Sequence, residues 1–165
     1  MIFLTVGTQL PFDRLVDLVD QAAPNIAEEV FAQIGETSFT PKNISFAHFL
    51  SPEEFQDRVA RSRLIVGHAG MGTLLTAAKY GKPVAVLARR REFNEHRNDH
   101  QLATVKQMSK LDGVYVFQSA DELLEIAASA LLRPVTSALS PEKARLISNI
   151  RSFMEGKMVD NVQLS

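Results

Sequence analysis

The sequence contains no cysteine, and its charges nearly cancel, with 18 Lys and Arg against 19 Asp and Glu and a formal net charge of −1. Without cysteine, disulfide bonds and thiolate chemistry are both excluded. The near-zero net charge gives no general electrostatic attraction for nucleic acids, so we expect no nucleic-acid partner. The absence of cysteine is typical of a cytosolic protein.

Long apolar runs are also missing. None approaches the roughly 20 residues that a membrane-spanning helix needs. Residues 1–6 are too short for a signal peptide, and no charged region precedes them. We therefore expect membrane contact only through a partner. With 165 residues, of which 45% are hydrophobic, the chain is expected to form one domain over residues 1–155, followed by a tail over residues 156–165.

Short apolar runs alternate with helical patterns along this domain. The patterns predict strands over residues 2–6, 29–34, 44–49, 64–66, 83–87 and 113–117. They predict helices over residues 12–23, 52–61, 73–80, 99–110, 119–132 and 141–154. This alternation predicts an α/β fold with a doubly wound, mostly parallel Rossmann-like sheet of about six strands.

Local signals mark several helix boundaries. In the first helix, Asp13, Asp17 and Asp20 are expected on the polar side. Ser51 before Pro52 predicts a capped helix start, and Ser119 with Glu122 predicts a capping box.

Three loops are expected to meet at the carboxyl ends of the strands, where parallel sheets bind ligands: residues 7–12, 67–73 and 88–101. The second loop contains Gly67, Gly70 and Gly72, which are expected to form a turn before a helix start. Free N–H groups and the helix dipole at such a start favour a phosphate. His68 and Thr73 could contact that phosphate, although a simple hydrogen bond or a cap would explain them equally well.

The glycine loop differs from two common phosphate motifs. It lacks the Gly-Lys-Ser/Thr of a Walker loop, and it follows the fourth strand, whereas a dinucleotide fingerprint follows the first.

The loop over residues 88–101 is the most polar part of the chain. Its arginines, Arg89 among them, suit phosphate, and its acids and amides suit sugar hydroxyls, although such a run is also typical of a solvated loop. His96 and His100 are four residues apart, but no third ligand is spaced to complete a metal site. No Ser-His-Asp or Cys-His arrangement is present; Asp13 is a possible base but is more typical of a first-turn helix acid.

Four segments together resemble a known family. They are VGTQLPFDRLV (6–16), GHAGMGT (67–73), YGKPVAV (80–86) and NEHRNDHQ (94–101). In this order and spacing they resemble the small subunit of split family-28-type glycosyltransferases, a group that includes the PssE and EpsE exopolysaccharide proteins and a eukaryotic subunit of N-glycan precursor synthesis. The chain is also similar to the carboxyl-terminal half of MurG.

The resemblance implies the donor-binding half of a GT-B hexosyltransferase that takes a UDP-linked sugar and needs no metal or other cofactor. The acceptor would be lipid-linked, as in bacterial exopolysaccharide synthesis. The catalytic base is expected on a membrane-associated PssD-like partner, which would hold this chain at the inner face of the membrane and without which it would be inactive. Arg89 comes from the polar loop alone, and the other predicted residues come from the resemblance. The full set predicted to bind the nucleotide sugar is Gly7, Thr8, Gln9, Gly67, His68, Ala69, Gly70, Gly72, Thr73, Arg89, His100 and Gln101.

One residue departs from the family pattern. Thr76 stands where family members often carry a Glu that holds the ribose. This departure keeps open the alternative of a non-catalytic nucleotide-sugar-binding scaffold or regulator of a membrane-associated partner. A third hypothesis, a dinucleotide oxidoreductase, is disfavoured by the position of the glycines. The sequence identifies neither the sugar nor the acceptor. Apolar residues of the last predicted helix are candidates for a partner surface, although packing on the sheet explains them more simply: Leu146, Ile147, Ile150, Phe153 and Met154.

Overall fold

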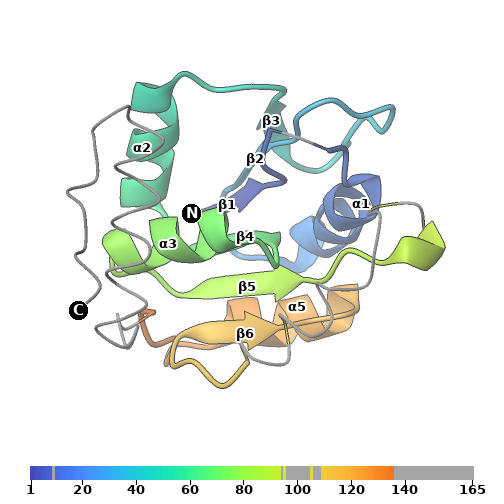
Figure 1. The fold of residues 1–165 in the computed structure, drawn as a ribbon. Coiled ribbons are helices and arrows are strands. Elements are labelled where there is room, and N and C mark those ends of the chain that lie inside the picture. The colour runs from blue at the N-terminus through green and yellow to red at the C-terminus, as the bar shows by residue number, and fades with distance from the viewer. Residues whose placement is uncertain (9, 94, 96–104, 106–108, 136–165) are drawn as a thin grey trace, which may run out of the picture.

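The computed structural model describes residues 1–8, 10–93, 95, 105 and 109–135 (Figure 1). Its strands are β1 (Ile2–Thr5), β2 (Val30–Gln33), β3 (Ser45–Ala47), β4 (Leu64–His68), β5 (Val84–Leu87) and β6 (Val114–Val116). Its helices are α1 (Asp13–Ala22), α2 (Pro52–Arg61), α3 (Met71–Lys79) and α5 (Ala120–Ala128), with 3-10 turns η1 (Ala23–Asn25) and η2 (Arg91–Phe93). The predicted doubly wound α/β sheet is confirmed.

The six strands form one sheet in the order β3-β2-β1-β4-β5-β6, and every neighbouring pair is parallel. The chain moves outward from β1 to β3 and then returns to β4, so the strand order reverses between β1 and β4. Parallel sheets bind their ligands at the carboxyl ends of the strands beside such a reversal. The fold therefore places the ends of β1 and β4 where a ligand site is expected.

Helices cover both faces of the sheet (Figure 1). Successive side chains of a strand point to opposite faces. Leu4 of β1 accordingly packs in one core with Leu15 of α1 and residues of α5, while its neighbour Phe3 packs in a second core with Leu74 of α3 and residues of α2. This double coverage explains why the strands read as continuous apolar runs in the sequence.

The prediction for Asp20 is wrong. Its side chain is buried, and its carboxylate accepts hydrogen bonds from the backbone N–H groups of Lys42 and Asn43, at 3.0 and 2.7 Å. Asp20 therefore anchors the loop that leads into β3. Helical spacing places this residue beside the polar positions of α1, but it does not reveal that another loop folds over it.

The helix caps predicted at Ser51 and Ser119 are both present, but the second needs one correction. At α2, Ser51 and Glu54 form a complete capping box, in which each side chain accepts from the other residue's backbone N–H. At α5, the Ser119 hydroxyl accepts from the N–H of Glu122, but the Glu122 carboxylate accepts from the N–H of Gln118. The predicted box at Ser119 is thus only half formed.

Several predicted elements lie outside the described residues, wholly or for the most part. They are the helix over 99–110, the helix over 141–154 with its apolar side chains, and the tail over 156–165. Within the described part of the chain, no helix has both the length and the apolar character to cross a lipid bilayer.

Candidate functional site

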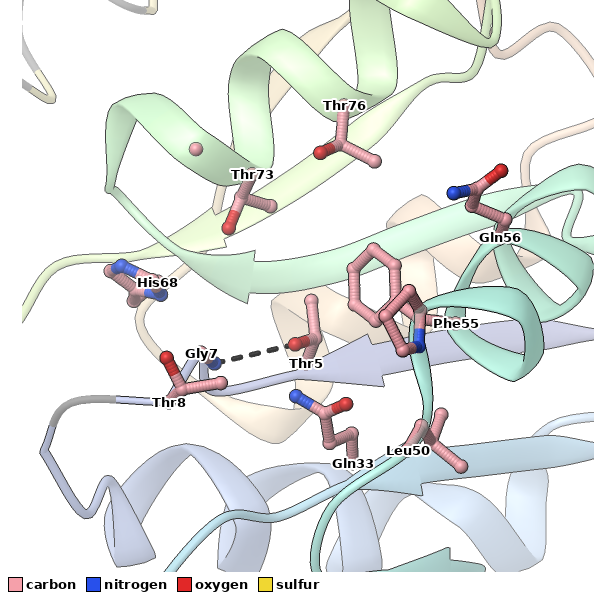
Figure 2. Close-up of a pocket in the computed structure, with 12 residues that line it drawn as sticks. Thr5, Gly7, Thr8, Gln33, Leu50, Phe55, Gln56, His68, Thr73 and Thr76 are labelled. Carbon is pink, nitrogen blue, oxygen red and sulfur yellow. Dashed lines mark hydrogen bonds between the residues drawn. The ribbon is translucent and has the colours of Figure 1, made fainter. Parts of the chain in front are cut away.

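A pocket of about 400 Å³ opens at the carboxyl edge of the sheet beside the reversal of strand order (Figure 2). It lies between the ends of β1, β2 and β4 and the first turns of α2 and α3. Its lining residues are Thr5, Gly7, Thr8, Gln33, Leu50, Pro52, Phe55, Gln56, His68, Gly72, Thr73 and Thr76. Two of the three loops predicted to meet at this edge, those after β1 and β4, line this pocket.

The floor of the pocket is formed by residues that pair with one another near the carboxyl ends of three adjacent strands. Thr5 of β1 pairs with Gln33 of β2 on one side and with Gly67 of β4 on the other. Thr5 and Gln33 are polar yet buried, which is unusual inside a parallel sheet. The strand ends thus give the pocket a polar floor.

Gly67 lies in β4 rather than in the predicted glycine turn. A Cβ at this position would come within 2.8 Å of Cγ2 of Thr73 and 3.1 Å of the Thr5 carbonyl oxygen. Glycine is therefore required here so that α3 can pack closely on the sheet. Ala69 is also structural, because it is buried in the core.

The start of α3 faces the pocket. Gly70 is its N-cap residue, and no side chain of the described residues caps the helix or places an acid in its first turn. The first N–H groups of a helix have no partner within that helix. A Cβ at Gly72 would meet no atom within 4 Å, so the space over this turn is open to a ligand. Thr73 adds a buried hydroxyl beside it.

The imidazole of His68 lies against two glycines. A Cβ at Gly70 would be 2.2 Å from Nε2 of His68, and one at Gly7, whose φ is +80°, would be 3.2 Å from Cε1. Any larger residue at Gly70 would displace the ring. These glycines therefore allow His68 to line the pocket next to the start of α3, as Figure 2 shows.

Arg89 lies elsewhere on the same edge. The residue is 3% exposed, and its guanidinium donates to the carbonyl oxygens of Val6, Leu10 and Pro11. It also stacks over the ring of Phe12, 4.5 Å from the centroid. Burial lowers the pKa of Arg89, against the opposing influence of Glu95. Arg89 does not line the pocket; it holds the loop that follows β1.

Arg14 and Glu95 complete this arrangement. Arg14 donates to both carboxylate oxygens of Glu95, at 2.7 and 2.8 Å, and to the carbonyl oxygen of Ala88. Glu95 also accepts from the backbone N–H of Arg90. We call Arg14, Arg89 and Glu95 the loop brace, because they join the loop after β5 to the loop after β1.

Asp13, the possible base, begins α1 and is also engaged. Its carboxylate accepts from the hydroxyls of Thr37 and Ser38. This geometry fits a structural first-turn acid that holds a neighbouring loop.

The predicted site residues therefore divide into groups. Gly7, Thr8, His68, Gly72 and Thr73 line one pocket, Gly67, Ala69 and Gly70 support it, and Arg89 belongs to the loop brace. Gln9, His100 and Gln101 lie outside the described residues. The sequence analysis missed Thr5, Gln33, Leu50, Pro52, Phe55 and Gln56 as pocket residues. Only Gln33 carries a visible signal, since it is a polar residue within an apolar strand just before Gly35.

The strand order and the pocket at its reversal define a Rossmann-like α/β domain with a ligand site at the carboxyl edge. The chain belongs to the family described as the glycosyltransferase family 28 C-terminal domain, whose model matches residues 1–154. The predicted membership of glycosyltransferase family 28 is thereby confirmed.

Comparison with individual proteins agrees. The human UDP-N-acetylglucosamine transferase subunit ALG13 is 29% identical over 123 residues, which are 66% of this chain but only 10% of the human protein. An NMR structure of ALG13 matches with a TM-score of 0.59 at 17% identity, over 88% of this chain and 93% of that one. The crystal structure of MurG from Acinetobacter baumannii matches with a TM-score of 0.52 at 17% identity, over 91% of this chain and 49% of MurG. The structural matches establish the fold; the PssE and EpsE assignment stays a prediction.

Proposed function

We propose that this chain is the donor-binding half of a two-component hexosyltransferase, which uses a UDP-linked sugar and a lipid-linked acceptor. The observation that carries the proposal is the pocket at the start of α3, in a domain of a glycosyltransferase family. The human relative's name, a UDP-N-acetylglucosamine transferase subunit, supports a UDP-sugar as the donor.

The diphosphate of the donor would lie at the first turn of α3. The uncapped N–H groups of this turn would donate to phosphate oxygens, and the helix dipole would favour the negative charge. Gly72 leaves space for close approach, and the hydroxyl of Thr73 and the ring of His68 lie beside that space. These groups account for five of the predicted binding residues when Gly7 and Thr8 at the rim are included.

We propose further that donor binding needs no divalent metal or other cofactor. Of the residues that the structure describes, those lining the pocket include threonine, glutamine and histidine but no Asp or Glu, the residues that usually hold Mg²⁺. Titration of UDP in the presence of EDTA, and again with added Mg²⁺, should give the same affinity. A large gain of affinity with Mg²⁺ would contradict this part of the proposal.

The acceptor side would belong to a separate PssD-like subunit. The chain matches 49% of MurG and a family model for a C-terminal domain, so the other half of such an enzyme lies outside this sequence. Large apolar side chains are exposed on loops of the carboxyl edge or at their ends: Leu10, Phe49, Met71 and Phe93. Such a group is typical of an interaction surface. By the resemblance to PssE, the partner would be membrane-associated, the product would enter an exopolysaccharide, and the chain would be cytoplasmic and inactive alone.

Thr76 favours one alternative, a nucleotide-sugar-binding scaffold or regulator without catalytic function. Its short hydroxyl lines the pocket where the family resemblance leads us to expect a carboxylate. A complex that synthesises polysaccharide with wild-type chain but not with Gly72→Asp, while partner binding is kept, would exclude a purely structural scaffold.

The decisive experiment is calorimetric titration of the purified chain with UDP, UDP-sugars and NAD, with and without a co-expressed PssD-like subunit. We expect UDP and UDP-sugars to bind, NAD not to bind, and Gly72→Asp to abolish binding. Gly72→Asn is the matched control, because it adds the same bulk without the charge and should lose less affinity. Absence of nucleotide binding even with the partner would overturn the proposal. Transferase activity of the chain alone would contradict the two-component arrangement.

A further inference from the structure

Gln33 is a buried polar residue that no motif singles out. It ends β2 in the floor of the pocket and is 4% exposed. Figure 2 shows its side-chain amide pointing up from β2 toward Thr5 and the centre of the pocket. Among the residues that the structure describes, none forms a hydrogen bond with this amide.

The fold does not use this amide. Among the described residues, its nitrogen and oxygen are not enclosed, unpartnered atoms but face the space of the pocket. The other residues of β2 are Val30, Phe31 and Ala32, all buried and apolar, and an apolar residue at position 33 would continue that pattern. Stability therefore does not explain Gln33, whereas a ligand in the pocket would satisfy its donor and its acceptor.

The position of Gln33 indicates which part of a ligand it meets. The start of α3 and His68 lie at one end of the pocket, and Leu50 and Phe55 lie toward the other (Figure 2). Leu50 and Phe55 pack against the apolar core, so they form an apolar wall there. A wall of this kind next to a single buried amide suits a flat heterocycle with polar atoms on its edge.

We infer that Gln33 recognises the nucleobase of the donor while the diphosphate lies at α3. The inference rests on the proposed function, because it takes a nucleotide sugar as the ligand. A glutamine amide offers one acceptor and one donor side by side. It therefore pairs with a pyrimidine edge on which a carbonyl oxygen lies next to a ring N–H, as it does on uracil.

The test compares Gln33→Met with the wild-type chain. Methionine keeps the length of the side chain but removes its hydrogen bonds. We expect the affinity for UDP to fall at least about tenfold, while the affinity for inorganic pyrophosphate stays the same. The melting temperature should stay the same or rise, because no protein hydrogen bond is lost. Gln21→Met is the matched control: this amide is exposed on α1 and does not line the pocket, so its loss should change UDP affinity less than about threefold.

A modified ligand makes the test specific for the base edge. UDP methylated at N3 of uracil lacks the ring N–H, so the wild-type chain should bind it at least about tenfold more weakly than UDP. Gln33→Met should bind the two ligands equally. Wild-type UDP affinity in Gln33→Met, a parallel loss of pyrophosphate binding, or a lowered melting temperature would each overturn the inference alone. Failure of the wild-type chain to bind UDP would overturn the proposed function together with it.

Discussion

Two groups of polar side chains share the carboxyl edge of the sheet, and they differ in what they bind. In the loop brace, Arg89 donates to several backbone carbonyls, and Arg14 forms a two-pronged ion pair with Glu95. In the pocket, the side chains of Gln33 and Thr73 form no hydrogen bond with another described residue. The brace thus stabilises the edge, while the pocket keeps polar groups available.

The first turns of α2 and α3 show the same difference between polar groups that are paired and polar groups that are available. At α2, the capping box satisfies the N–H groups of Ser51 and Glu54, and two acids lie in the first turn. At α3, glycine replaces the capping serine and no acid is present. A capped start contributes stability, whereas an open start leaves donors for an anion. The difference teaches that polar residues which the fold has already paired are poor candidates for ligand contacts.

The largest expected effect is that of Arg89→Met on stability. Three carbonyl oxygens of the loop after β1 would lose a buried donor, so we expect the free energy of unfolding to fall by about 3 kcal/mol. The melting temperature would fall by roughly 6–12 °C. UDP affinity of the folded variant should change less than about threefold, which corresponds to under 1 kcal/mol. Thermal unfolding and calorimetry measure the two quantities.

Arg90→Met is the control for this prediction. Arg90 is the next residue, but its side-chain bonds to Glu92 and Gln118 are both exposed, so their loss should change stability by less than about 0.5 kcal/mol. Loss of UDP binding in Arg89→Met without loss of stability would contradict the brace. It would return Arg89 to the phosphate-binding role that the sequence suggested.

Two glycines of the same turn should respond in opposite directions. Gly70→Ala would force a Cβ to 2.2 Å from Nε2 of His68, which we expect to lower stability by about 1–3 kcal/mol. Gly72→Ala would place its Cβ in open space within a helix and should be neutral or stabilising by up to about 1 kcal/mol. Both variants should bind UDP more weakly. Denaturant unfolding tests the prediction, and equal destabilisation by the two changes would show that the space at Gly72 is not kept for a ligand.

The fold was predictable because the spacing of apolar residues, which distinguishes strands from helices, can be seen in residues that are close together in the sequence. Runs such as 64–66 and 83–87 predicted β4 and β5, and the alternation with helices predicted the parallel sheet. The glycines also indicated a helix start after β4, but α3 begins at Met71, so Gly72 lies within the helix and not in the predicted turn before it.

Pairing between distant residues was not predictable in the same way. Arg89 lies in a run of arginines that suits phosphate, and only the fold shows its contacts with Val6 and Leu10. Asp20 meets Lys42 and Asn43, and Gln33 enters the pocket because β2 pairs with β1. Each of these roles depends on which segments become neighbours in space, which a single sequence does not state.

Thr76→Glu tests whether the ribose of the nucleotide lies next to this position in the pocket. A carboxylate on the second turn of α3 could accept hydrogen bonds from both ribose hydroxyls, so we expect UDP to bind about tenfold more tightly. Binding of 2′-deoxy-UDP should gain less, because one hydroxyl is missing. Thr76→Gln is the neutral control of equal length and should give a smaller gain. Equal effects on both nucleotides would show that the ribose is held elsewhere in the pocket.

The smallest expected effect is the change in stability when the capping box of α2 loses its charge. The pKa of Glu54 is lowered, first by the hydrogen bond from the Ser51 backbone N–H and then by the Ser51 side chain. Since the folded pKa lies below the unfolded one, the carboxylate contributes stability above the unfolded value of about 4.3. That contribution is lost as the pH falls through the folded pKa. Glu54→Gln should therefore melt slightly below the wild type at pH 7.

Melting curves of the two proteins from pH 7 to pH 3 test this prediction. Their melting temperatures should converge once the pH has fallen below the folded pKa of Glu54, because both residues are then neutral. A gap that stays constant with pH would show that the box acts through its geometry and not through its charge. The α2 and α3 starts would then differ only in the presence of a cap, and the absence of an acid at α3 would lose its value as a sign of an anion site.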